Sequence, residues 1–164
     1  MTTIQGILIP ADGLREIELV DIDQDDYKSI QQHVGGPFEM TELLRPEASL
    51  WSNEEGKIHD LELNRRATLM LWVHRTEFRE ADYIVGDVLV LGPADKAGRT
   101  MGAPEELVNL LFHTEQYRYL VQVTNDDTWN GNGVTYDNWV DAYNGGLALA
   151  KRWILVENVK VIAA

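Results

Sequence analysis

The sequence predicts an α+β fold, with a mixed, mainly antiparallel sheet and three to four short helices. Short β-branched or alternating apolar runs are separated by turn residues, which is typical of strands. Other stretches carry apolar residues at helical spacing between capping residues. Because the two kinds of segment do not alternate regularly, a doubly wound parallel sheet is disfavoured.

The chain is predicted to begin with a hairpin. Residues 4–9 are a compact apolar run, and Ala11-Asp12-Gly13 supplies turn residues. Residues 14–20 alternate at Ile17 and Leu19, which indicates a half-exposed strand. We therefore expect these two strands to pair with each other.

A helix is predicted next, over residues 25–34. Tyr27, Ile30 and Val34 fall on one apolar stripe, and the acidic residues before them offer several N-caps. Gly35-Gly36-Pro37 ends the pattern, since glycine readily takes the left-handed C-cap conformation.

The middle of the chain holds its densest apolar run. Residues 38–44 and 48–52 are predicted strands, and Asn64 is a predicted N-cap for a helix over residues 65–74. Residues 69–73 are all apolar, so we expect this helix to be buried on most sides.

Two further elements are predicted around a polar loop. Residues 83–91 are rich in β-branched residues and predict a strand, with Gly86-Asp87 as a kink or bulge. After the loop, Pro104 at a first helical position opens a helix that reaches about residue 113.

The last part of the chain predicts a strand, a helix and a strand. Residues 117–124 form the first of these, and residues 136–143 form a short helix that ends at Gly145-Gly146. Residues 147–153 extend or restart that helix, and residues 154–162 predict the final strand.

The 164 residues fit one domain with an extension. The character of the sequence changes after Thr124, where a turn-rich loop begins. We therefore expect a core domain of residues 1–124 and a C-terminal extension of residues 125–164, packed on that core.

Composition excludes several classes of function. The chain has no cysteine, which excludes a disulfide scaffold, a thiolate metal site and a cysteine nucleophile. The net charge is −13, and residues 1–63 hold 14 acidic against 4 basic side chains. Such a chain should repel nucleic acid and anionic membranes, so a protein with a basic surface is the expected partner. No leader and no apolar run of about 18 residues is visible, which favours a cytoplasmic protein.

Five short pieces resemble a known family when they are taken together. They are I-P-A-D-G from residue 9, H-V-G-G from residue 33, N-E-E-G-K from residue 53, L-N-R-R-A-T from residue 63 and I-V-G-D-V-L-V-L-G from residue 84. Their order and spacing resemble a domain-of-unknown-function family of actinobacterial phages and bacterial mobile elements, over about residues 4–121. The resemblance implies a small, cytoplasmic, non-virion phage protein and brings no catalytic residue with it.

One acidic cluster stands out as a candidate partner-binding surface. Residues two apart on a strand lie about 6.6–6.8 Å apart on one face. Rows of carboxylates at that scale can imitate the phosphates of a duplex, although an exposed hairpin followed by an acidic helix start has the same composition. The cluster consists of Glu16, Glu18, Asp21, Asp23, Asp25 and Asp26.

A small-ligand or catalytic site is the alternative, in the turn after residue 52 and at the start of the following helix. Backbone N–H groups at a helix start can bind anions, and paired carboxylates can serve acid–base chemistry. Adjacent carboxylates on an extended segment point apart, however, and arginines often neutralise neighbouring acids. The residues concerned are Asn53, Glu54, Glu55, Lys57, Asn64 and Arg65.

Metal and cofactor sites are not favoured. Asp126, Thr128, Asn130 and Asp137 have the spacing of a calcium loop, but Thr at the third position, Asp at the twelfth and an entering strand all weaken that match. No nucleotide fingerprint or phosphate-binding glycine loop occurs, so no cofactor is expected.

The four histidines have a structural interpretation that requires no metal. The histidines lack zinc-ligand spacing and are expected at helix ends or on the surface. They are His33, His59, His74 and His113.

A homo-oligomeric structural protein is a further alternative, with the aromatic residues of the extension as its interface. Aromatic residues of this kind are also common in cores. The set comprises Trp129, Tyr136, Trp139, Tyr143 and Trp153.

Overall fold

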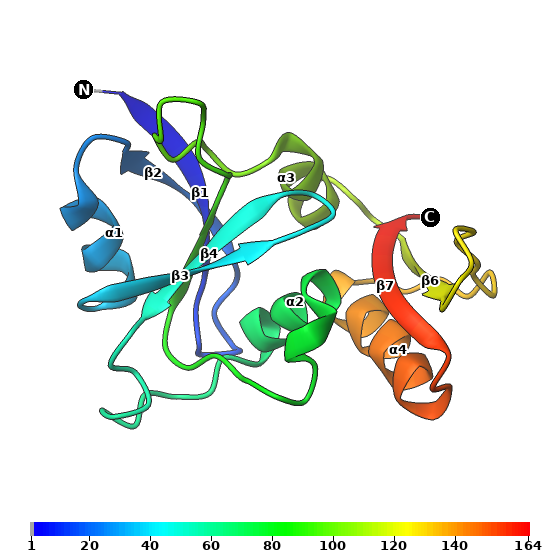
Figure 1. The fold of residues 1–164 in the computed structure, drawn as a ribbon. Helices are drawn as coiled ribbons and strands as arrows, with labels where there is room; N and C mark the ends of the chain where they lie inside the picture. The colour runs from blue at the N-terminus through cyan, green and yellow to red at the C-terminus, as the bar shows by residue number, and fades with distance from the viewer. Residues whose placement is uncertain (1) are drawn as a thin grey trace.

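Seven strands form two antiparallel sheets in the computed structural model, which describes residues 2–164 (Figure 1). The larger sheet consists of β1 (Thr3–Ile9), β2 (Glu18–Asp23), β3 (Phe38–Leu43), β4 (Ala48–Asn53) and β5 (Val88–Leu91). Its strand order is β2-β1-β5-β4-β3. The smaller sheet pairs β6 (Tyr117–Val123) with β7 (Val156–Ala163). The predicted α+β class, with mainly antiparallel pairing, is confirmed.

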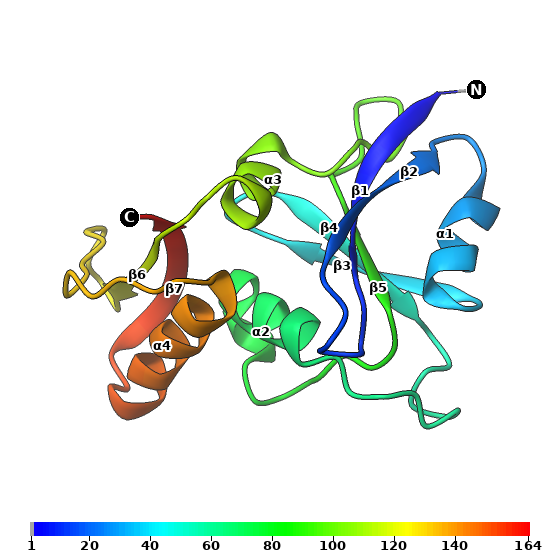
Figure 2. The ribbon, with the colours of Figure 1, turned by 180° about the vertical axis from the view of Figure 1, so that it is seen from behind.

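Four α-helices pack around these sheets in the described part of the chain. They are α1 (Tyr27–Val34), α2 (Arg65–His74), α3 (Glu105–Phe112) and α4 (Trp139–Arg152), with a 3-10 turn η1 (Thr76–Phe78) after α2. Both views place α1 at one end of the molecule, and α4 with the smaller sheet at the other (Figure 2). None of the helices within residues 2–164 has the length and hydropathy needed to cross a bilayer.

The larger sheet separates two apolar clusters, because its strands alternate buried side chains between their two faces. The small cluster lies between the sheet and α1, and the large cluster continues from the other face into α2, α4 and the smaller sheet. The small cluster comprises Ile22, Ile30, Val34, Trp51, Leu89 and Leu91. Burial of each such side chain stabilises the fold by about 1.5–3 kcal/mol.

The first hairpin forms as predicted, but its second strand is displaced along the sequence. β2 runs from Glu18 to Asp23 and pairs antiparallel with β1, so that Thr3 lies opposite Asp23. The strand continues past its predicted end because Ile22 is needed in the small cluster. The helix consequently starts later, with Asp26 as its N-cap, and it ends at Gly35, whose φ is 82°.

The predicted strand over residues 83–91 is only partly formed. Gly86 takes a φ of 77°, which breaks the extended backbone, and regular pairing begins at Val88. Before this kink a single bridge joins Val85 to Leu63. The next helix begins at Glu105, with Pro104 as its N-cap and not as its first helical residue.

The pair Gly145-Gly146 does not end a helix, which corrects the predicted stop and confirms the alternative that the following residues extend the helix. α4 runs without interruption from Trp139 to Arg152. A Cβ atom on Gly146 would lie 2.5 Å from Cγ1 of Val159, and one on Gly145 would lie 2.5 Å from the hydroxyl of Tyr136. The two glycines therefore allow a close approach between α4 and the smaller sheet, which the sequence alone does not distinguish from a helix stop.

Residues on both sides of position 124 share one apolar cluster. β6, which precedes this position, pairs along its length with β7, which follows it. Tyr143 and Ala142 of α4 are fully buried in the cluster that also holds Met70 of α2. The C-terminal segment thus supplies one strand and one helix to the packing of the larger part of the chain.

Candidate functional site

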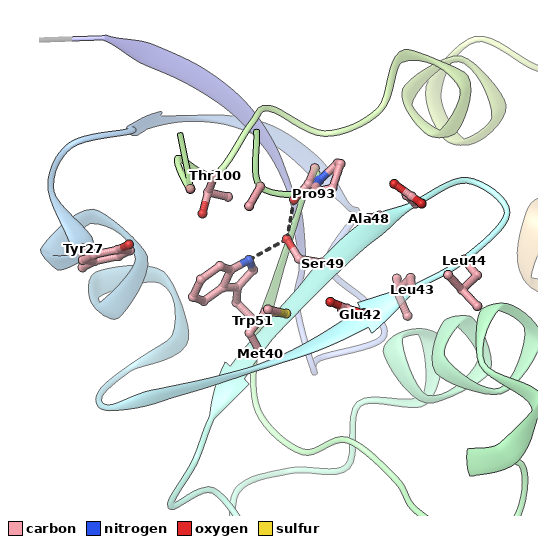
Figure 3. A pocket seen from close by; sticks show the side chains of 14 residues that line it. Tyr27, Met40, Glu42, Leu43, Leu44, Ala48, Ser49, Trp51, Pro93 and Thr100 are labelled. Carbon is pink, nitrogen blue, oxygen red and sulfur yellow. Dashed lines mark hydrogen bonds between the residues drawn. The ribbon is translucent and has the colours of Figure 1, made fainter. Parts of the chain in front are cut away.

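A cavity of about 470 Å³ lies beside α1, on the same face of the larger sheet (Figure 3). Its floor is formed by β3 and β4, where Met40 and Trp51 are directly opposite each other. Tyr27 of α1 closes one side, and the loop between Pro93 and Thr100 closes another. Ligand-binding cavities commonly measure about 300–1,000 Å³, so this one has the size of a ligand site.

The indole ring of Trp51 is held in place at this floor. Its Nε1–H donates to Oγ of Ser49 at 2.9 Å, and the Ser49 hydroxyl donates in turn to the carbonyl of Gly92 at 2.7 Å. Phe38 meets the same indole edge-on, with ring centroids 5.0 Å apart. The aromatic floor of the cavity is therefore fixed before any ligand arrives.

Two carboxylates line the cavity, and no basic side chain of residues 2–164 does so. Glu42 is on the cavity face of β3, opposite Ser49, and Glu47 follows the turn between β3 and β4. Both are exposed, and neither forms a salt bridge within residues 2–164. The cavity therefore combines apolar and aromatic walls with uncompensated negative charge.

The predicted ligand turn is divided between different surroundings. Asn53, Glu54 and Lys57 line a small hollow of about 70 Å³, in which Lys57 Nζ is 2.7 Å from Oδ1 of Asp82. The hydrogen bond and the charge of Asp82 raise the pKa of Lys57. Glu55 instead pairs with His59 at 2.9 Å.

Asn64 and Arg65 do not join that hollow. Asn64 is completely buried as the N-cap of α2, where its Oδ1 accepts from the N–H of Ala67. Its Nδ2 donates to the carbonyls of Ile9 and Gly86, both at 2.9 Å. Every hydrogen-bonding group of this side chain is therefore engaged by the fold, while Arg65 is exposed at the first turn of α2.

The acidic cluster follows one edge of the larger sheet and the start of α1, because β2 is an edge strand. Alternation along β2 places Asp21 and Asp23 on the face of Leu19, and Glu18 on the opposite face with Val20. Glu16 precedes the strand and is exposed. The carboxylates therefore surround this edge instead of forming a single row.

Two of these acids accept local hydrogen bonds, and a third forms a salt bridge. Oδ1 of Asp23 accepts from the N–H of Asp25, and Oδ1 of Asp26 accepts from the N–H of Lys28, each at 2.9 Å. Asp25 forms the one salt bridge of the set within residues 2–164, to Arg99 at 3.1 Å. The remaining charge of the cluster faces solvent without a cationic partner in the described chain.

The residues of the calcium alternative are separated by the structure. Asp126 follows the end of β6, where its Oδ1 accepts from the N–H of Thr128. Asn130 pairs with Val121 within β6, whereas Asp137 accepts from Gln116 just before β6 begins. Because Asp126 and Asp137 are at opposite ends of a seven-residue strand, they do not converge on one ion.

His74 is buried, although it was predicted at a helix end or on the surface. It does end α2, but its Nδ1–H donates to the carbonyl of Leu44 at 2.9 Å. Its Nε2 therefore accepts the hydroxyl of Tyr143 at 2.6 Å. Burial lowers the pKa of His74 to about 4, and burial raises the pKa of Tyr143.

The aromatic residues of the extension divide between core and surface. Trp139 and Tyr143 are buried and meet edge-on at 5.1 Å, whereas Trp153 is 43% exposed. Ile154 and Leu155, which follow it in the turn before β7, are 93% and 53% exposed. The ammonium of Lys160 lies over the ring of Trp129, 4.4 Å from its centroid, and the ring of Tyr136 packs near that of Tyr119.

Hydrogen bonds join the five motif pieces in two groups at one end of the larger sheet: the pieces that start at residues 9, 63 and 84, and the pieces that start at residues 33 and 53. Asn64 binds Ile9 and Gly86, as described above, and Oδ1 of Asp87 accepts from the N–H of Ala11 at 2.9 Å. Nη2 of Arg66 donates to the carbonyl of Pro10 at 2.8 Å, and Nδ2 of Asn53 donates to that of Val34. These residues cap helices and fasten turns, so the resemblance rests on residues that the fold requires.

The cavity residues were not predicted as a site. Alternation in β3 and β4 already places Met40 and Glu42 on one face with Ser49 and Trp51, which is the signal available in the sequence. The alternation does not reveal that α1 leaves this part of the face open. That depends on the position of α1 relative to the strands, which only the structure provides.

The fold and its cavity define a small α+β protein with a ligand-sized acidic site. Residues 4–118 match the model of the family described as Domain of unknown function (DUF3846). Since the match covers more than half of the chain, the protein belongs to this family. No curated protein and no solved structure matches the chain. The matched region ends inside β6 and includes every element that bounds the cavity.

Proposed function

We propose that this protein is a non-enzymatic binding protein that docks its acidic surface on a basic partner protein and blocks that partner. In this proposal the chain comes from a phage or another mobile element and acts in the cytoplasm of the host cell. The partner is a host protein that handles nucleic acid or defends the cell. Blocking is steric and electrostatic, and the net charge of −13 accelerates the encounter.

The observation that carries this proposal is the uncompensated charge along the edge of the larger sheet. Of the six carboxylates around β2 and the start of α1, Asp25 alone has a salt-bridge partner within residues 2–164. A basic protein surface would supply the missing cations. Where that surface normally binds nucleic acid, the carboxylates would take the place of phosphates.

A non-enzymatic role is supported by the way the buried polar side chains are used. Asn64 is hydrogen-bonded entirely to main-chain groups, and His74 is bonded to Leu44 and Tyr143. These are residue types that often serve catalysis. Here the fold itself engages them.

The test is a pull-down from an actinobacterial lysate with three forms of the protein. The first is the wild type, and the second carries Asp21→Asn, Asp23→Asn, Asp25→Asn and Asp26→Asn. Asparagine is as good an N-cap as aspartate, so the second form keeps the start of α1. The third removes the same charge from another surface, by Glu105→Gln, Glu106→Gln, Asp126→Asn and Asp127→Asn.

We expect the wild type and the charge-matched control to retain one stoichiometric protein at low salt, and to lose it at high salt. The variant at the edge of β2 should fail to retain it. Equal retention by all three forms would contradict docking through this edge. If the partner binds nucleic acid and this protein at the same time, its nucleic-acid site is not blocked, which would contradict that part of the proposal.

Self-association is a second candidate, favoured by the exposed apolar turn of Trp153, Ile154 and Leu155. Neighbouring apolar side chains on a surface often mark a protein interface. Sedimentation of the wild type over a range of concentrations should then show an oligomer that Ile154→Asp dissociates. A monomer at every concentration would exclude this candidate.

A further inference from the structure

The cavity beside α1 differs from the acidic edge in being a preformed hollow. α1 covers the part of the sheet that holds Ile22 and Leu89 but leaves Met40 46% exposed. Tyr27 and the loop from Pro93 to Thr100 enclose that uncovered part from two sides, as Figure 3 shows. A side chain entering here would meet walls that are already in place.

The charge of the cavity selects a cation. Glu42 and Glu47 are the charged residues that line it, and they have no salt bridge within residues 2–164. Two nearby arginines are engaged elsewhere, and Arg45 of the turn between β3 and β4 does not line the cavity. Arg75 pairs with Glu77 and donates to the carbonyl of Glu42, and Arg99 pairs with Asp25. An incoming cation would therefore find two carboxylates that no salt bridge within residues 2–164 occupies.

The walls of the cavity select a planar cation on an apolar stem. Met40 and the fixed ring of Trp51 offer apolar surface, and Tyr27 adds a second aromatic ring that is 57% exposed. A guanidinium group stacks on aromatic rings and binds carboxylates through two parallel hydrogen bonds. An ammonium is a more strongly hydrated point charge, which fits such walls less well.

We propose that this cavity receives an arginine side chain of the partner protein. The guanidinium reaches Glu42 and Glu47, while the methylene stem packs on Met40 and Trp51. This inference rests on the proposed function, because it names the group of the basic partner that enters the protein. In this inference the cavity determines the specificity for the partner, and the acidic edge of β2 supplies the long-range attraction.

The test follows the Nε1–H signal of Trp51 in a proton–nitrogen correlation spectrum, assigned with Trp51→Phe. N-acetyl-arginine-N-methylamide is the probe, and the citrulline analogue is its neutral counterpart of the same shape. We expect a dissociation constant on the order of 1 mM for the arginine probe, as for other small ligands. The lysine analogue should bind more weakly, and the citrulline analogue should leave the signal in place.

The Glu42→Gln, Glu47→Gln double variant should weaken binding of the arginine probe at least about tenfold, which is about 1.4 kcal/mol. Glu39→Gln is the matched control, since Glu39 is exposed on the opposite face of the same strand. Its affinity should equal that of the wild type. If the double variant does not fold, Glu47→Gln alone and the loss of wild-type affinity at high salt provide the same test.

Four results would overturn the inference. They are no movement of the Trp51 signal, equal binding of the citrulline probe, equal binding by the double variant, and equal or tighter binding of the lysine analogue. As a fifth such result, binding of free agmatine without binding of the capped arginine would assign the cavity to a small free cation and not to a protein side chain.

The pull-down of the partner protein distinguishes a failure of this inference from a failure of the proposed function. If the Glu42→Gln, Glu47→Gln variant captures the partner with wild-type affinity, the inference fails and the proposed function stands. If the arginine probe binds but no salt-sensitive partner is captured, the proposed function fails and a guanidinium site remains.

Discussion

Tyr143 donates its hydroxyl hydrogen to Nε2 of His74 across 2.6 Å, deep inside the large apolar cluster. The bond joins the last residue of α2 to the second turn of α4, and the two residues are 69 positions apart in the chain. Because Leu44 accepts from the other ring nitrogen, the histidine is held in one neutral form. This pair fastens the C-terminal helix to the rest of the protein.

Tyr143→Phe should destabilise the protein by about 1–3 kcal/mol, because it leaves a buried acceptor on His74 without a donor. Urea denaturation followed by circular dichroism measures this change. Tyr83→Phe is the control, since Tyr83 is exposed and its hydroxyl has no hydrogen bond within residues 2–164. Its effect should stay within about 0.5 kcal/mol. Equal effects of the two substitutions would contradict a structural role for the buried pair.

Stability should decrease as the pH falls from about 6.5 towards 4. Burial lowers the pKa of His74 to about 4, whereas the unfolded chain binds that proton near pH 6.5. The contribution is therefore complete above about pH 6.5 and is lost below about pH 4, with a total of about 3 kcal/mol.

The measurement that checks this pH dependence is the free energy of unfolding between about pH 5 and pH 7, where most carboxylates stay charged. His74→Gln removes the titrating group and serves as the reference. The wild type should lose stability more steeply than this variant does. Parallel profiles for the two proteins would contradict a buried neutral imidazole.

Gly146→Ala should destabilise the protein by about 1–3 kcal/mol, although alanine is normally the better helix residue. The added methyl group would lie 2.5 Å from Cγ1 of Val159 and 3.2 Å from Cβ of Tyr119. Asn144→Ala, at an exposed position of the same helix, should be neutral or slightly stabilising. Thermal unfolding of the two variants measures both changes in stability. If Gly146→Ala stabilises the protein, α4 can move away from β6 and β7, and the prediction is wrong.

Asn64→Ala should cost about 3 kcal/mol or more, because it removes an N-cap and two long-range hydrogen bonds to buried carbonyls. Asp26→Ala provides the comparison, since Asp26 caps α1 through one local bond and should cost about 1 kcal/mol. Denaturant titration of both variants gives the difference between them. Similar losses would mean that the bonds to Ile9 and Gly86 contribute little.

Local sequence signals predicted most elements, because capping and alternation act over a few residues. Asn64 marked the start of α2, and Gly35 marked the end of α1. The errors arose where a distant contact decides the conformation. Gly145-Gly146 looked like a helix stop because the sequence does not show that Val159 and Tyr119 lie against the helix.

The candidate site was less predictable for the same reason. Glu42 and Trp51 belong to different strands, and Tyr27 belongs to a helix, so their proximity depends on how these elements pack. The sequence drew attention to Asn64 as a ligand residue because of its place at a helix start. Its complete burial depends on β1 and on the kink at Gly86, which bring two carbonyls to it.

The end of the family match inside β6 has a consequence for the evolution of such proteins. β6 takes its pairing partner from β7, which lies beyond the matched region. A relative that stops near residue 118 would lack most of β6 together with α4 and β7, and would leave an open apolar surface beside α2. Its lineage would have to replace the missing strands and helix, either with a different C-terminal segment or with a neighbouring subunit.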